Sequence, residues 1–100
     1  MDMHAIDQSV EEDRLEREDS LRSDGGDVWA ENYQPGTLGC HELLDRTSIL
    51  AAHLDEQLLS HPACVHNPAW FALAHQAATA LNDLYQKIGA EHLTCPEQTE

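Results

Sequence analysis

The sequence predicts an all-α protein, an antiparallel hairpin of two amphipathic helices over about residues 38–60 and 68–89, preceded by an acidic N-terminal arm. Three observations predict this fold. Apolar residues recur at steps of three and four in both segments, as on one face of a helix. The connection at residues 61–67 contains proline and is short, so the two helices should lie antiparallel. Residues 1–36, in contrast, are densely charged and poor in apolar side chains.

The first helix is expected to begin near Thr37 and to end near Ser60, because Pro62 disfavours helical geometry at the residue before it. Its apolar positions follow helical spacing, and four leucines share one stripe that we expect to face the core. Those leucines are Leu43, Leu50, Leu54 and Leu58.

The second helix has clearer boundaries. Asn67 is a favourable N-cap and Pro68 suits the first helical position. Lys87 complements the C-terminal end of the helix dipole, and Gly89 can adopt the left-handed cap that ends many helices. The face expected to be buried consists of Trp70, Phe71, Ala74, Ala77, Ala78, Leu81, Leu84, Tyr85 and Ile88.

The arm at residues 1–36 has eleven acidic and three basic residues, and we expect it to be mostly disordered. One short helix is expected within it, over residues 10–22, since Ser9 and Glu12 fit a capping box. Residues 37–93 then form the hairpin domain, and residues 94–100 form a flexible tail.

A hairpin of this size is near the limit at which one core is sufficient, and each helix is apolar over a wider arc than one neighbour covers. We therefore expect a homo-oligomer in which two hairpins pair into a four-helix bundle. The alternative is that the arm covers the surplus with Trp29 and Tyr33.

The formal net charge of −14 opposes direct binding of nucleic acids, which depends on Lys and Arg contacts to phosphate. No apolar run is long enough for a membrane span, and no signal peptide is apparent. Three cysteines do not make a complete disulfide framework. We therefore expect a cytoplasmic protein with reduced thiols.

Histidine and cysteine gather in the connection between the helices, where His61, Cys64 and His66 are candidate metal ligands. Imidazole and thiolate are the usual ligands of zinc, the one cofactor that the sequence suggests. Cys40 lies at the opposite end of the hairpin and could join them only from another subunit. No second tight pair completes the spacing of an established zinc motif.

No catalytic motif occurs, so no catalytic residue is assigned and we expect a non-enzymatic protein. Glu42 and Asp45 resemble half of the carboxylate set of a magnesium-dependent hydrolase, but the facing pair is missing. Arg46 and Lys87 are the only bases of the hairpin. Duplicated across subunits, they could bind a small anionic ligand, with Tyr85 stacking on a base.

Three stretches, Gly36–Leu44, His61–Ala63 and Leu84–Ala90, resemble those of small uncharacterised helical proteins encoded by phages and bacteria. The resemblance covers the hairpin and implies no specific activity. We expect a small helical interaction protein, in a phage or mobile-element setting, that captures a host protein or ligand in the host cytoplasm. The alternatives are an oligomeric sponge for an anionic nucleotide signal and a His/Cys metal-binding protein.

Overall fold

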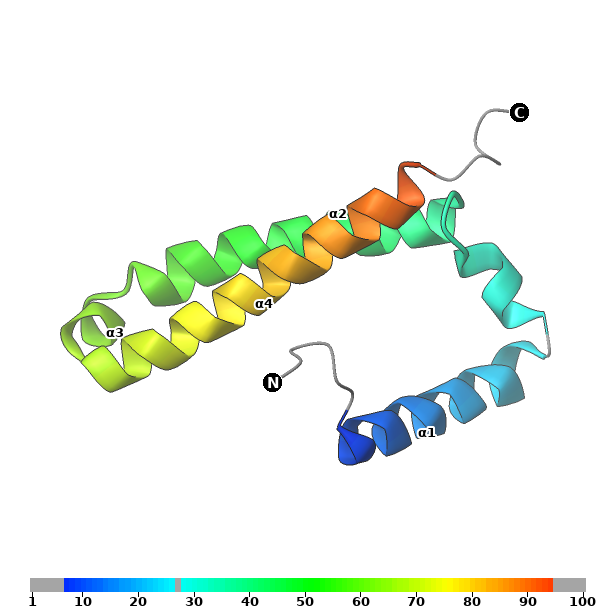
Figure 1. Cartoon of the computed structure of the whole chain (residues 1–100), viewed down its shortest axis with the longest axis horizontal. Coiled ribbons are helices and arrows are strands. Elements are labelled where there is room, and N and C mark those ends of the chain that lie inside the picture. Colours follow the sequence, from blue (N-terminus) through cyan, green and yellow to red (C-terminus); the bar gives the residue numbers. More distant parts are fainter. Residues whose placement is uncertain (1–6, 27, 95–100) are drawn as a thin grey trace. The chain divides into compact units, whose positions relative to one another are not determined.

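A computed structural model describes residues 7–26 and 28–94 (Figure 1). The chain divides into two compact units, Met1–Asn32 and Tyr33–Glu100, and each is considered by itself. The described part of the first unit contains one long helix, and that of the second contains the helical hairpin. The described residues contain helices and no strands, which confirms the all-α class.

Helix α1 (Gln8–Gly25) corrects two expectations for the arm. The helix is continuous over 18 residues, so it extends past both ends of the expected 10–22 segment, and the described arm is not mostly disordered. Its N-cap is Asp7, whose carboxylate accepts a hydrogen bond from the Ser9 N–H at 2.8 Å, and not Ser9 itself. An aspartate cap satisfies the same unpaired N–H groups as a serine cap.

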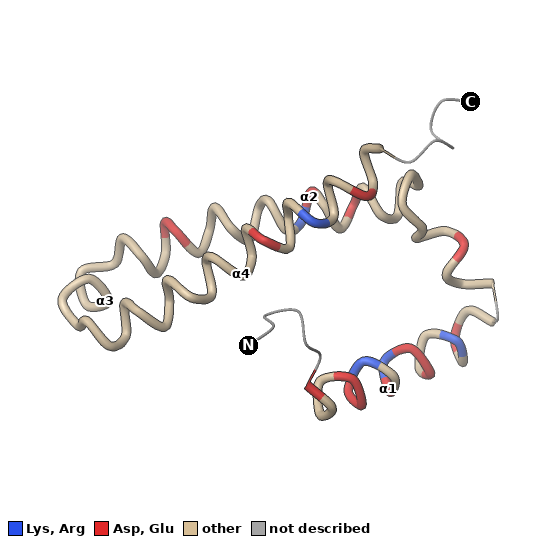
Figure 2. Tube along the Cα trace, viewed as in Figure 1, with Lys and Arg blue, Asp and Glu red and all other residues tan. Residues whose placement is uncertain are grey.

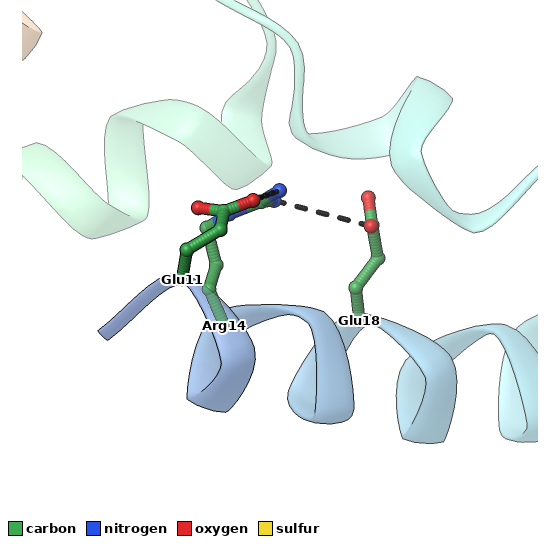
Figure 3. A network of polar contacts seen from close by, with 3 residues as sticks. All are labelled: Glu11, Arg14 and Glu18. Carbon is green, nitrogen blue, oxygen red and sulfur yellow. Dashed lines mark hydrogen bonds and ion pairs between the residues drawn. The ribbon is translucent and has the colours of Figure 1, made fainter. Parts of the chain in front are cut away.

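Helix α1 has no buried residue, so no packed core stabilises it. Its side chains instead form ion pairs along the surface of the helix. Arg14 lies between Glu11 and Glu18, with its Nε donating to Glu11 at 2.9 Å and its Nη1 lying 3.9 Å from Glu18 (Figure 3). Arg17 pairs with Asp13 one turn away. Such pairs at steps of three and four each add a few tenths of a kcal/mol to a helix, roughly 0.2–0.5. A short 3₁₀ helix, η1 (Trp29–Tyr33), follows.

The hairpin begins with α2 (Leu38–Leu54), capped by the Thr37 side chain, which accepts from the Cys40 N–H at 3.2 Å. The helix continues through a π-helical turn, η2 (Asp55–Leu59). The connection is not wholly irregular, because it contains a one-turn helix, α3 (Pro62–His66), capped by the His61 ring.

Helix α4 (Pro68–His92) returns antiparallel beside α2 (Figure 1). The predicted start is confirmed, since the Asn67 side chain accepts from the N–H groups of Ala69 and Trp70 at 3.1 Å each, and Pro68 occupies the first turn. The predicted end is wrong: the helix passes through Gly89 in ordinary helical geometry and stops at His92. Gly89 lies near Leu44 of α2, within the stretch where the two helices run side by side.

The two helices meet along a seam that repeats at alternating steps of three and four in both. This is the heptad spacing of helices that pack nearly antiparallel over their whole length. Small residues near its middle permit a close approach of the backbones. The seam consists of Cys40, Leu44, Thr47, Ala51 and Leu54 in α2 and of Phe71, Ala74, Ala78, Leu81, Tyr85, Ile88 and His92 in α4.

The π-helical turn shifts this seam by one residue. The heptad steps would place Leu58 against α4, but Leu58 is exposed and Leu59 is half-buried. A π-turn contains one residue more than an α-turn, so the inward position moves from 58 to 59.

The expected leucine stripe is therefore only partly correct. Leu54 lies on the seam, whereas Leu43, Leu50 and Leu58 are about half exposed. Leu44 and Thr47 are buried in their place. Four residues that were expected to be core residues of the second helix are also exposed: Trp70, Ala77, Leu84 and, at 36%, Tyr85. The apolar arc of each helix is wider than the strip that the other helix covers. The seam therefore buries only one edge of that arc.

Candidate functional site

The hairpin exposes several large apolar side chains on one of its sides, and we call this set the apolar face. Its large side chains are between 45% and 64% exposed. It consists of Leu43 and Leu50 of α2 and Trp70, Leu73, Ala77 and Leu84 of α4. The polar residues Arg46, His53, Lys87 and Glu91 also immediately precede seam residues and lie on the same side.

Each member of the apolar face immediately precedes a seam residue, and this places all six on one side of the hairpin. One residue turns a helix by about 100°. In two antiparallel helices that face each other, the residues one step before the seam positions therefore lie on the same side of the pair. Leu43 beside Leu44 and Leu84 beside Tyr85 illustrate the rule.

The residues that immediately follow the seam lie on the opposite side and are mostly polar. This polar face consists of His41, Asp45, Ser48 and Ala52 of α2 and His75, Thr79, Asn82 and Gln86 of α4, all of them exposed. The hairpin is thus unequal on its two sides, with more exposed apolar surface on the side of the apolar face and mostly polar residues on the other.

A shallow pocket of about 270 Å³ opens at the α2 end of this surface. Tyr33 and Cys40 line it, together with Leu43 of the apolar face. Its polar rim is the Glu42–Arg46 ion pair, in which Arg46 Nη2 lies 2.8 Å from Glu42 Oε2. Tyr33 therefore lines a pocket together with α2 but stays 57% exposed. Covering of the surplus apolar surface by the arm stays a prediction.

The three residues predicted to bind an anionic ligand do not form one site within a single hairpin. Arg46 is paired with Glu42, Tyr85 lies on the seam, and Lys87 makes no ion pair with the described residues. The arginine shares its pocket with Tyr33 and not with Tyr85. The sponge hypothesis is neither tested nor strengthened by this placement.

The three predicted metal ligands occur together in α3 and its cap, but they do not form a cluster. The His61 Nδ1 accepts from the Ala63 N–H at 3.1 Å, Cys64 is half-buried with a free thiol, and His66 is exposed. Across residues 7–26 and 28–94, no group of three or more His, Cys, Asp or Glu residues could hold a metal ion. Zinc binding stays a prediction. The third cysteine, Cys95, lies outside the described residues.

One polar contact of the hairpin is not indicated by any pattern in the sequence. His92, at the end of α4, is buried, and its Nδ1 accepts a hydrogen bond from the Gly36 N–H at 2.8 Å. Its ring also lies against that of His41, with centroids 5.4 Å apart. The Pro35-Gly36 turn was visible in the sequence, but nothing there indicated which residue would receive its N–H.

The charges of the molecule are unevenly placed (Figure 2). Acidic and basic residues crowd α1, where the Ser9 hydroxyl and N–H lower the pKa of Asp7 by hydrogen bonding, and Arg14 lowers the pKa of Glu11 in the same way. These pairs also raise the pKa of Arg14 above its usual range. Charged residues are sparser along the two long helices of the hairpin than along α1.

Comparison of the chain with protein-family models, with curated proteins and with solved structures finds no match in any of the three. Among the described helices, none combines the length and the apolar character that crossing a membrane requires.

Proposed function

We propose that this chain is a small non-enzymatic helical interaction protein whose hairpin works as an oligomer, with the apolar face of one copy covered by that of a second. The observation that carries the proposal is the unequal exposure of apolar side chains on the two sides of the hairpin. An apolar face beside a polar face is the pattern of a hairpin that contributes half of a four-helix bundle.

The small core of the isolated hairpin supports a permanent partner. Among the described residues, only Cys40 and Leu44 are buried apolar residues, and no large side chain is fully buried. A domain of this size needs further cover to be stable. A second copy is present whenever the chain is synthesised, which favours it over a partner encountered only at times.

The area of the apolar face agrees with a homodimer interface. Five half-exposed large side chains and one alanine provide on the order of 500 Å² of apolar surface per copy. A standard interface buries about 800 Å² per partner, of which roughly 65% is apolar in homodimers. Trp70 is the expected anchor, since tryptophan is enriched among the residues that dominate interface energies.

The assembly would have a role in presentation or capture. The non-enzymatic part of the proposal rests on a sequence without catalytic motifs. Capture of a host protein or a small ligand, suggested by the resemblance to phage-encoded helical proteins, requires the assembled surface first. The polar face is the side of the hairpin that the assembly would leave open.

Light scattering coupled to size-exclusion chromatography tests the oligomer. We expect a mass of two chains for the wild type and of one chain for Leu73→Asp, because a carboxylate in the paired faces would be buried without a partner. The matched control is Thr79→Asp, which places the same charge on the polar face of the same helix and should keep the mass of two chains. A compact wild-type chain that stays single at high concentration would overturn the proposal.

A further inference from the structure

The segment that leads into α2 is a tight turn with a defined geometry. The Thr37 N–H donates to the Gln34 carbonyl at 3.1 Å, which closes a four-residue turn around Pro35 and Gly36. Gly36 has a φ of 94°, in the left-handed region. Proline second and glycine third, with a positive φ at the third position, define a type II turn. The N–H of Gly36 takes no part in the hydrogen bond that closes it.

The Gly36 N–H donates its hydrogen bond to a histidine that lies 56 residues further along the chain. His92 is the last residue of α4 and is only 4% exposed. Its Nδ1 accepts the Gly36 N–H at 2.8 Å, within the ordinary range for an N–H donor. A single buried imidazole thus ties the entry of the first hairpin helix to the exit of the last one.

The direction of this hydrogen bond fixes the state of the ring. A nitrogen that accepts a hydrogen bond carries no proton, so this contact requires the form of His92 that has its proton on Nε2. In the imidazolium form both nitrogens are donors, and Nδ1–H would face the Gly36 N–H. Two donors at that distance repel each other, and the buried N–H of Gly36 would lose its acceptor.

Of the neighbouring ionisable groups, an imidazole adds to this effect and a carboxylate opposes it. From α2, the titratable group against the ring is His41, and a second imidazolium there would repel the first. The Gln34–Thr37 turn contributes no ionisable side chain, and the adjacent carboxylate within α4 is Glu91.

We propose that Gly36, His92 and His41 form a pH-sensitive clasp, closed when His92 is neutral and opened by its protonation. Histidine is the side chain whose charge ordinarily changes between about pH 5 and 8. Opening releases the turn and, immediately before it, Tyr33, which forms one wall of the pocket over Cys40. The clasp thereby controls access to the pocket at the open end of the hairpin.

Nuclear magnetic resonance of the full chain tests the clasp. Between pH 8 and pH 5, we expect the Gly36 amide resonance to shift with the same midpoint as the His92 ring. Its protection from hydrogen exchange, corrected for the intrinsic rate, should fall by about tenfold as the bond is lost. A His92 ring that titrates while Gly36 shows neither change would overturn the proposal.

Two substitutions separate the clasp from a general effect of acid. In His92→Asn, the side-chain oxygen replaces Nδ1 as acceptor but does not titrate, so Gly36 should stay protected at both pH values. In His92→Phe, the acceptor is absent, and Gly36 should show the acid behaviour at pH 8. An acid transition at Gly36 that survives in His92→Asn would contradict the clasp. So would a Gly36 that stays protected at pH 8 in His92→Phe.

Discussion

Two glycines of the hairpin domain lie in opposite kinds of backbone and should respond oppositely to the same change. Gly89 has ordinary helical geometry, and a Cβ built there would lie 3.7 Å from Leu44 Cδ1, an ordinary contact. Gly36 has a φ of 94°, which a residue with a side chain adopts only at a cost.

We therefore expect Gly89→Ala to stabilise the hairpin by about 0.5–1 kcal/mol, because alanine is the better helix former and no atom has to move. Gly36→Ala should destabilise it by about 1 kcal/mol or more, because of strain at the turn. Chemical denaturation followed by circular dichroism measures both. If Gly89→Ala were as damaging as Gly36→Ala, the packing of α4 on Leu44 would be tighter than described.

At the level of elements, the first residues of the helices were predicted better than their last residues. They were also predicted better than the side of each helix that packs against the other. Asn67 and Pro68 mark the start of α4 through local chemistry, because a capping side chain and a fixed φ act on their own backbone. The end of α4 lies past Gly89, which is near Leu44 of the other helix, and the local glycine signal did not indicate this continuation.

The rotation of each helix was predicted poorly for a similar reason. The apolar arc of α2 includes both the seam and the apolar face, and the sequence pattern does not show which part faces α4. Thr47 was missed because it is polar, yet its hydroxyl donates to the Leu43 carbonyl at 2.8 Å and so can be buried. The π-turn at η2 places Leu58 outward, and no proline or glycine within that segment indicates the turn in the sequence.

The pH dependence of α1 should be visible at its first turn. The folded pKa of Asp7 is lowered from an ordinary value of 3.8, so its stabilising effect is complete above that value and is lost as pH falls through the lowered value. We expect helical carbon chemical shifts at residues 8–11 to decrease below about pH 4. Further along α1, protonation of the many carboxylates reduces their mutual repulsion, so the total helix signal would mix opposing effects.

Asp7→Asn is the matched control for that experiment, because an asparagine oxygen caps a helix but does not titrate. The first turn of this variant should keep its helical shifts over the same range of pH. Equal acid losses in both proteins would show that the Asp7 cap is not the titrating group.

At the scale of the whole molecule, the two units should unfold independently. We expect this because α1 has no buried residue, and Arg14 and Arg17 pair with carboxylates of the same helix. Deleting residues 1–32 should reduce the total helix signal by the share of α1 and leave the thermal midpoint of the hairpin within a few degrees, since about 1 kcal/mol corresponds to roughly 4–8 °C for a domain of this size. A larger fall in the midpoint would mean that the first unit stabilises the second.

Assembly through the apolar face has a thermodynamic consequence that a monomer cannot show. When folding and association are linked, stability depends on protomer concentration, and each tenfold increase adds about 1.4 kcal/mol per dimer. We expect a hundredfold increase in concentration to raise the thermal midpoint of the wild type by on the order of 10 °C. Leu73→Asp should unfold at a lower midpoint that does not change with concentration, whereas Thr79→Asp should behave as the wild type. A wild-type midpoint independent of concentration would mean that the seam between α2 and α4 alone sustains the hairpin, and that its exposed leucines and Trp70 serve another purpose.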